Sequence, residues 1–166
     1  MGSVAYIGLG SNVGDRGLTL MEALKALDDA EGVEVRRVSR FTITEPVGGP
    51  EDQPPYLNGA AEVVTDLAPD ELLATLQGIE RRLGRNRDAE QRWGPRTCDL
   101  DLLLFADRRL DDPALTVPHP RMHEREFVLE PLVQIAPQLT HPVLGKTMAE
   151  LLDDLRAAPA PPQPIP

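Results

Sequence analysis

Hydrophobic positions recur at two spacings along the first two thirds of the chain. Short runs of alternating or continuous apolar residues predict strands, and apolar residues three or four apart predict helices. Glycine and proline separate these segments. The expected elements are a strand over 3–9, a helix carrying Leu20, Leu24 and Leu27 and ending before Gly32, a strand from Val33 to Ile43, a strand over 57–64, a helix from Pro69 to Gly84 with Leu72, Leu76, Ile79 and Leu83 as its apolar stripe, and a strand over 99–105.

The last third of the chain is punctuated by proline. Residues 106–109 resemble a turn, and Pro113, Pro118 and Pro120 interrupt the stretch that follows. We expect a helix from Glu124 to Ile135, interrupted by Pro131, and a short helix from Met148 to Ala157. Residues 159–166 contain only Ala, Pro, Gln and Ile, and their composition predicts a disordered tail. The pattern indicates one domain over residues 1–158.

The expected order of elements is β-α-β-β-α-β with helices added at the C-terminus. This order predicts an α+β, ferredoxin-like fold, in which helices cover one face of an antiparallel sheet. The other face of the sheet is then available for a site.

Composition narrows the function classes. The 166 residues carry a formal net charge of −10, which argues against a surface for duplex nucleic acid. Aromatic residues make up 4% of the chain, too few for an RNA-binding sheet built on stacked bases. No apolar run has membrane-spanning length, and no secretory signal is visible at the N-terminus. With Cys98 as the single cysteine, these features favour a cytoplasmic protein without membrane or nucleic-acid partners, and a monomer is the default.

Two aspartates begin the predicted strand over 99–105. Alternation places Asp99 and Asp101 on one face with Leu103 and Phe105, and Leu100, Leu102 and Leu104 on the other. Two partly buried carboxylates this close together are stabilised by a divalent cation, and hard oxygen ligands on a rigid strand suit Mg²⁺. The alternative is that both aspartates lie at an exposed strand end and face water.

Arginines cluster just before these aspartates, in an otherwise acidic chain. A magnesium site next to them requires an anion in between, and arginine binds phosphate through two parallel hydrogen bonds. A solvated helix end and loop is the simpler alternative. Trp93 can stack on a flat ring or cover the core. The basic residues of the cluster are Arg81, Arg82, Arg85, Arg87, Arg92 and Arg96.

Two common nucleotide motifs are absent in their usual form. Gly8, Gly10 and Gly14 miss the dinucleotide-binding spacing by one residue, and Gly145-Lys146 lies far from any phosphate-loop context. The three histidines do not form a zinc-binding set. The residues alone therefore indicate a magnesium-dependent, phosphate-handling site on a ferredoxin-like sheet.

At these residues the chain closely resembles the 6-hydroxymethyl-7,8-dihydropterin pyrophosphokinases, over about residues 3–150. The matching segments are Gly10-Ser11-Asn12, Thr44-Glu45-Pro46-Val47-Gly48, 53–58, Gly84-Arg85-Asn86-Arg87, the block from Arg92 to Asp101, and Val117-Pro118-His119-Pro120-Arg121-Met122. The resemblance implies transfer of pyrophosphate from ATP to the pterin alcohol in folate biosynthesis, with AMP leaving. An inactive or regulatory nucleotide-binding homologue is the alternative.

The resemblance also implies a role for each matched position. Asp99 and Asp101 resemble the ligands of two Mg²⁺ ions, with Asp99 also beside the pterin. Arg85, Arg87 and Arg96 resemble catalytic arginines, although the loop after Arg87 is one residue longer here. The implied ATP-binding residues are Gln77, Glu80, Arg85, Arg87, Trp93, Arg96, Thr116, His119 and Arg125. The implied pterin-binding residues are Thr44, Val47, Gly48, Tyr56, Asn58, Trp93, Asp99 and Phe127.

The sequence departs from the family pattern at two places. Pro120 follows the histidine where some members have an aromatic residue, so no stacking is expected there. Gly49 is an extra residue that can alter the loop over the pterin. No residue stands out as a strong general base, so catalysis is expected to depend on in-line positioning and charge neutralisation.

Overall fold

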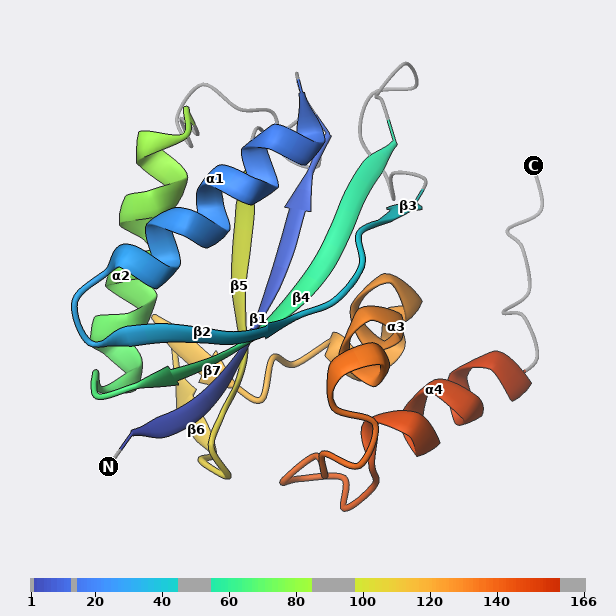
Figure 1. Ribbon diagram of the computed structural model, residues 1–166. Helices are drawn as coiled ribbons and strands as arrows, with labels where there is room; N and C mark the ends of the chain where they lie inside the picture. Colours follow the sequence, from blue (N-terminus) through green and yellow to red (C-terminus); the bar gives the residue numbers. More distant parts are fainter. Residues whose placement is uncertain (1, 13–14, 45–54, 85–97, 159–166) are drawn as a thin grey trace.

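A computed structural model describes residues 2–12, 15–44, 55–84 and 98–158. Figure 1 shows a sheet with helices packed on both of its faces. Among the described residues, no helix is long and apolar enough to cross a membrane. The elements are β1 (Ser3–Ser11), α1 (Arg16–Asp29), β2 (Val33–Val38), β3 (Thr42–Thr44), β4 (Tyr56–Thr65), α2 (Pro69–Arg82), β5 (Asp99–Phe105), β6 (Leu110–Asp112), β7 (Leu115–Val117), a 3-10 turn (Met122–Glu124), α3 (Glu126–Ile135) and α4 (Met148–Ala157).

The main sheet is antiparallel, in the order β2-β4-β1-β5, and the short β3 pairs with β4 beyond the end of β2. If β2 and β3 are counted as one interrupted strand, this is the order of a ferredoxin-like fold. The predicted fold class is therefore confirmed. The strand β5, which carries the paired aspartates, lies at an edge of the sheet.

The helices α1 and α2 begin where the sequence provides caps. Asp15 accepts a hydrogen bond from the backbone N–H of Leu18 at 3.1 Å. Pro69 occupies the first turn of α2, where a missing N–H costs nothing, and Glu71 accepts from the N–H of Ala68 at 2.9 Å. Gly84 follows α2 with φ of 96°, a conformation that glycine adopts without strain. The predicted bounds of α2 hold closely, and α1 ends before Gly32 as predicted.

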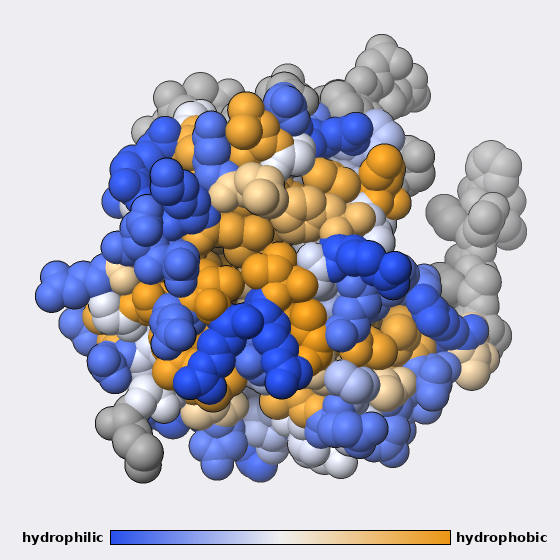
Figure 2. Space-filling model, viewed as in Figure 1, coloured by the Kyte–Doolittle hydropathy of each residue, from blue (hydrophilic) through white to orange (hydrophobic). Residues whose placement is uncertain are grey.

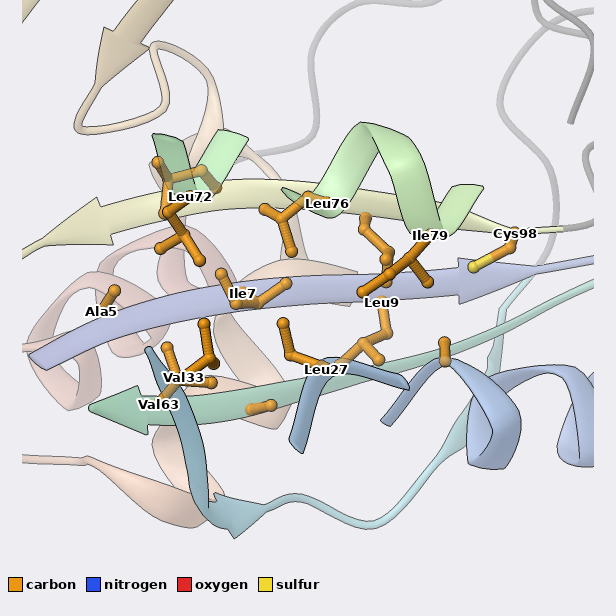
Figure 3. Packing of buried hydrophobic residues seen from close by; sticks show 14 of the residues in the cluster. Ala5, Ile7, Leu9, Leu27, Val33, Val63, Leu72, Leu76, Ile79 and Cys98 are labelled. Atoms are coloured by element: carbon orange, nitrogen blue, oxygen red, sulfur yellow. The ribbon is translucent and has the colours of Figure 1, made fainter. Parts of the chain in front are cut away.

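The main core lies between these helices and the sheet, and Figure 3 shows its side chains in contact. Ile7 of β1 is fully buried against Leu27 of α1 and Leu72 and Leu76 of α2. Each such side chain contributes roughly 1.5–3 kcal/mol of burial free energy. This layer holds β1 and β5 rigidly from behind.

The opposite face of the sheet is less open than the sequence suggested. Helices α3 and α4 pack on it through Leu129, Leu132 and Leu151, which form a second cluster with Tyr6 and Leu104. The C-terminal helices are apolar enough on one side to need such a partner. The expectation of an uncovered face is therefore corrected, because this part of the second face is covered.

The face assignments within β5 need a second correction. The pairing of β1 with β5 shifts between Tyr6 and Ile7, so that Leu102 opposes Ile7 while Leu104 opposes Tyr6. Leu103 is the extra residue, and a bulge of this kind reverses the alternation that follows it. Leu104 therefore joins the second cluster, and Phe105 returns to the main core. Asp99 and Asp101, before the bulge, keep the predicted common face.

Smaller differences concern proline and short strands. Pro131 does not interrupt α3, which runs continuously from Glu126 to Ile135 with the proline ring buried. The strand expected from Val33 to Ile43 is split into β2 and β3. Residues 110–117 form a small hairpin of β6 and β7 that the sequence did not predict.

Hydrophobic side chains also reach the surface across the middle of the face drawn in Figure 2, between α1 and α3. Isolated exposed apolar residues are common in folded proteins and do not by themselves mark a site. Over the whole described part of the chain, the large apolar residues that are clearly exposed are Leu18, Met21, Val38, Ile43, Val143 and Leu144.

Candidate active site

Three residues form a row across the strands at one end of the sheet. Gly10 of β1 pairs with Asn58 of β4 on one side and with Asp99 of β5 on the other. Gly8, two residues earlier, pairs with Asp101. Since side chains two apart share a face, Asn58, Asp99 and Asp101 project from the face opposite α1 and α2. The sheet therefore places an amide and two carboxylates side by side.

The absence of a side chain at Gly10 leaves space within this row. A Cβ atom at that position would lie 3.0 Å from Oδ1 of Asn58, 3.8 Å from Cδ1 of Tyr56 and 4.0 Å from Cβ of Asp99. Any larger residue would fill the gap between these three side chains. Glycine thus opens a space bounded by an aromatic ring, an amide and a carboxylate.

The amide of Asn58 has a fixed orientation. Its Nδ2 donates a hydrogen bond to Oγ1 of Thr44 on β3, and the side chain is almost fully buried. The carbonyl oxygen Oδ1 is the atom nearest to Gly10. An acceptor held in this way suits the N–H groups of a flat heterocycle.

The carboxylates of Asp99 and Asp101 are half-buried. Within the described ranges, no group of three or more His, Cys, Asp or Glu side chains is arranged to hold a metal ion. A pair of carboxylates fits Mg²⁺, which keeps several waters and takes its remaining oxygens from bound phosphates. The donor set present is therefore compatible with the predicted magnesium site.

His119 lies close enough to Asp99 for the carboxylate to affect its pKa. Burial lowers the pKa of His119, the positive charges of Arg125 and Arg121 lower it further, and Asp99 opposes them. Its Nδ1 accepts from the backbone N–H of Arg121 at 3.3 Å, so the neutral ring carries its proton on Nε2. His119 can therefore donate one hydrogen bond from a neutral ring beside the acidic pair.

The remaining predicted residues lie around this centre or outside the described residues. Arg125, directly before α3, places its guanidinium 5.7 Å from the ring centroid of Phe127. Thr116 of β7 donates from its hydroxyl to the carbonyl of Asp112 at 3.3 Å. Gln77 is half-buried on α2. The predicted residues Val47, Gly48, Arg85, Arg87, Trp93 and Arg96 lie outside the described residues.

Glu80 has a different environment from the other predicted residues. It is 2% exposed, and its Oε2 accepts a hydrogen bond from the backbone N–H of Leu100 at 2.9 Å. The carboxylate of α2 therefore reaches the strand that carries Asp99 and Asp101.

Arg16 and Gly10 had no predicted role. Arg16 donates from Nη1 to the carbonyl of Pro55 at 2.6 Å, and so ties the start of α1 to the residue before Tyr56. Gly10 opens the space described above. Neither contact is indicated by the local sequence, because Pro55 and Asn58 lie far along the chain from Arg16 and Gly10.

Comparison with known proteins decides the family. The sequence model described as 7,8-dihydro-6-hydroxymethylpterin-pyrophosphokinase (HPPK) matches residues 6–137. This chain belongs to the HPPK family. The matched region contains the row across the sheet, both carboxylates and His119.

Curated relatives of this HPPK chain agree with that assignment. It is 51% identical over 139 residues to the 2-amino-4-hydroxy-6-hydroxymethyldihydropteridine pyrophosphokinase of Bacillus subtilis, covering 84% of this chain and 81% of the relative. It is 46% identical over 147 residues to the Pseudomonas aeruginosa protein of the same name, covering 89% and 88% of the two chains.

Solved structures support the fold. The wild-type Plasmodium falciparum HPPK-DHPS structure with pterin and p-hydroxybenzoate superposes with a TM-score of 0.70 at 15% identity. The match covers 93% of this HPPK chain and 43% of that longer one. At this level of identity the similarity establishes a common fold only.

Proposed function

We propose that this HPPK transfers the pyrophosphoryl group of ATP to the hydroxymethyl oxygen of 6-hydroxymethyl-7,8-dihydropterin, releasing AMP. The observation that carries the proposal is the Asn58–Gly10–Asp99 row. It places a fixed amide acceptor, an open space and a carboxylate next to one another on three paired strands. A pterin ring bound above Gly10 would have its polar edge at Asn58 and its reacting end toward Asp99.

Asp99 and Asp101 are the residues that would hold two Mg²⁺ ions together with the phosphates of ATP. Bound magnesium would neutralise charge on the phosphates and on the leaving AMP. The rigid strand behind the aspartates, fixed by Leu100 and Leu102 in the main core, keeps the carboxylates in place during turnover.

ATP would bind on the side of the carboxylates that faces α2 and the turn around His119. A neutral His119 with its proton on Nε2 would donate a hydrogen bond to the nucleotide, and Arg125 would supply positive charge. The proposed ATP-contacting residues are Gln77, Arg85, Arg87, Trp93, Arg96, Thr116, His119 and Arg125, with Arg85, Arg87 and Arg96 acting on the transferred group.

The pterin would bind between aromatic faces over the row. Tyr56 borders the space above Gly10, and Phe127 carries the Arg125 guanidinium on its ring. Stacking on such rings and a hydrogen bond to Asn58 would orient the hydroxymethyl oxygen. The proposed pterin-contacting residues are Thr44, Val47, Gly48, Tyr56, Asn58, Trp93, Asp99 and Phe127.

The catalytic contribution of the protein would be positioning and charge neutralisation. The neutral His119 is a hydrogen-bond donor in this arrangement, and no described residue is assigned as a general base. The pterin oxygen would attack the β-phosphorus in line with the departing AMP oxygen. We further infer a cytoplasmic monomer, from the composition and the single, buried Cys98.

The test is AMP formation by Asp99→Asn and Asp101→Asn with ATP, pterin and magnesium. Each substitution removes a charge while keeping the side-chain shape, so turnover should fall at least about a hundredfold, roughly 2.7 kcal/mol of transition-state stabilisation. Asp107→Asn, an exposed aspartate in the turn after β5, is the matched control and should retain wild-type turnover. Near-normal activity in either active-site variant would refute the metal assignment.

A further inference from the structure

Two hydrogen bonds from the described part of the chain reach the backbone of β5 on its outer edge. In an antiparallel ladder every second residue turns its N–H and C=O away from its neighbour strand, and β5 has β1 on one side only. On the other side, the N–H of Leu100 donates to Oε2 of Glu80 at 2.9 Å. The carbonyl of Leu103 accepts from the N–H of His119 at 2.8 Å.

These contacts connect the strand of the acidic pair to two other parts of the site. Glu80 belongs to the last turn of α2, the helix that also carries Gln77. His119 follows the β7 strand. The first contact falls on the residue between Asp99 and Asp101, and the second falls on Leu103, the bulge residue. Leu100 is therefore the point at which α2 acts on both carboxylates.

The burial of Glu80 makes its hydrogen bond to the Leu100 N–H necessary for a stable fold. Its neighbours on α2, Leu76 and Ile79, lie in the main core with Leu100. A carboxylate so enclosed must be hydrogen-bonded, and a buried N–H that loses its acceptor is equally unfavourable. The Glu80–Leu100 bond thus fixes the distance between α2 and the beginning of β5.

We propose that Glu80 is a positioning residue: it holds the backbone of Leu100 so that Asp99 and Asp101 project with the geometry needed for magnesium. This role takes the place of the nucleotide contact that the family resemblance implied for Glu80. It rests on the proposed metal-binding role of the two aspartates, and it requires a hydrogen-bond acceptor at position 80 rather than a negative charge.

The substitutions Glu80→Gln and Glu80→Leu separate acceptor from charge. The glutamine oxygen can still accept from Leu100, whereas leucine fills similar space without an acceptor. Leu72→Ala serves as a control for general destabilisation. Leu72 is a buried residue of α2, eight residues before Glu80 along the chain.

Two measurements follow for each variant. The first is hydrogen exchange at the Leu100 amide, followed by NMR, which needs no catalysis. The second is the Mg²⁺ dependence of turnover, paired with Mn²⁺ binding in the presence of a non-hydrolysable ATP analogue. The Leu variant should exchange Leu100 at least about tenfold faster, need about tenfold more Mg²⁺ and bind Mn²⁺ about tenfold more weakly. The Gln variant should stay within about threefold of wild type in all three.

Leu72→Ala should lower stability without changing the Mg²⁺ requirement. If Glu80→Leu does not fold, the Gln variant decides: an unprotected Leu100 amide or a tenfold higher Mg²⁺ requirement would overturn the proposal. So would a Leu variant that weakens binding of the ATP analogue without magnesium but keeps wild-type Mn²⁺ affinity, because that result would make Glu80 a nucleotide contact. If wild-type protein formed no AMP, the proposed function would fail, while amide exchange and Mn²⁺ binding would still test Glu80.

Discussion

Oδ1 of Asn58 lies 3.0 Å from the point at which a side chain would begin at Gly10. This distance is at the limit of contact, so even a methyl group at position 10 must displace the amide. The relationship links a glycine in β1 to the residue proposed to bind the pterin edge.

Gly10→Ala should therefore raise the KM for pterin about tenfold, which corresponds to roughly 1.4 kcal/mol of lost binding. The KM for ATP should change little. Gly8→Ala is a matched control on the same strand and face, because its new Cβ would meet Leu103 at 3.5 Å, an ordinary contact. Steady-state kinetics with each substrate varied separately tests both variants, and equal pterin KM values for the two would contradict the account.

Thr44→Val should loosen the orientation of Asn58. Valine has nearly the same shape as threonine but cannot accept the hydrogen bond from Nδ2. A neutral hydrogen bond contributes about 1 kcal/mol, so the KM for pterin should rise roughly fivefold. Thr42→Val makes the same exchange two residues earlier on β3 and should have a smaller effect. An unchanged pterin KM in Thr44→Val would show that the contact does not orient the amide.

The location of this site could be predicted only in part from the sequence. The alternation of Asp99, Leu100 and Asp101 was sufficient to place both carboxylates on one face, because local backbone geometry determines it. The position of the bulge was not predictable, since Leu102, Leu103 and Leu104 are all apolar and suit either face. The row across the sheet depends on strand register, which no local pattern around Gly10 or Asn58 specifies.

Glu80 and Pro131 are two further residues whose environment could not be predicted from the local sequence. Glu80 is three residues from Gln77, and the sequence gives no reason for one to be buried and the other half-exposed. Its partner, Leu100, is twenty residues away. Pro131 predicts an interruption from local sterics, yet the helix continues and the ring is buried. In both cases tertiary packing outweighs the local signal.

His141 should make the protein less stable in mild acid. Its Nδ1 accepts from the N–H groups of Val143 at 3.2 Å and Leu144 at 3.1 Å, which protonation would prevent. Burial, and then the nearby His123, lower the pKa of His141 below the usual 6.5. The unfolded chain therefore binds a proton before the folded one does. The contribution of His141 to stability is constant above pH 6.5, falls as the pH drops from 6.5 to its folded-state pKa, and then levels off.

Urea unfolding at several pH values, with NMR titration of the histidine ring protons, tests this prediction. His141→Asn should remove part of the stability loss between pH 6.5 and 5, and His123→Gln should raise the pKa of His141. A folded-state pKa of His141 at or above 6.5 would contradict the assignment.

Tyr6→Phe should affect stability but not substrate binding. The hydroxyl of Tyr6 donates to Oε1 of Glu62 at 2.6 Å, and burial together with this bond raises the pKa of Tyr6. Because the acceptor is charged, loss of this hydrogen bond should lower the free energy of unfolding by about 1.5–3 kcal/mol. Both substrate KM values should remain at wild type. A double-mutant cycle with Glu62→Leu, which removes the acceptor, measures the coupling, and a coupling energy near zero would show that the bond contributes nothing.

The most direct test of the central claim is the identity of the nucleotide product. Purified protein would be incubated with ATP, Mg²⁺ and 6-hydroxymethyl-7,8-dihydropterin, with controls that omit the pterin or add EDTA. We expect AMP and pterin diphosphate in equal amounts, formed only when pterin and magnesium are both present. Formation of ADP would mean attack at the γ-phosphorus, and ATP binding without any product would indicate an inactive homologue; either result would contradict the proposed function.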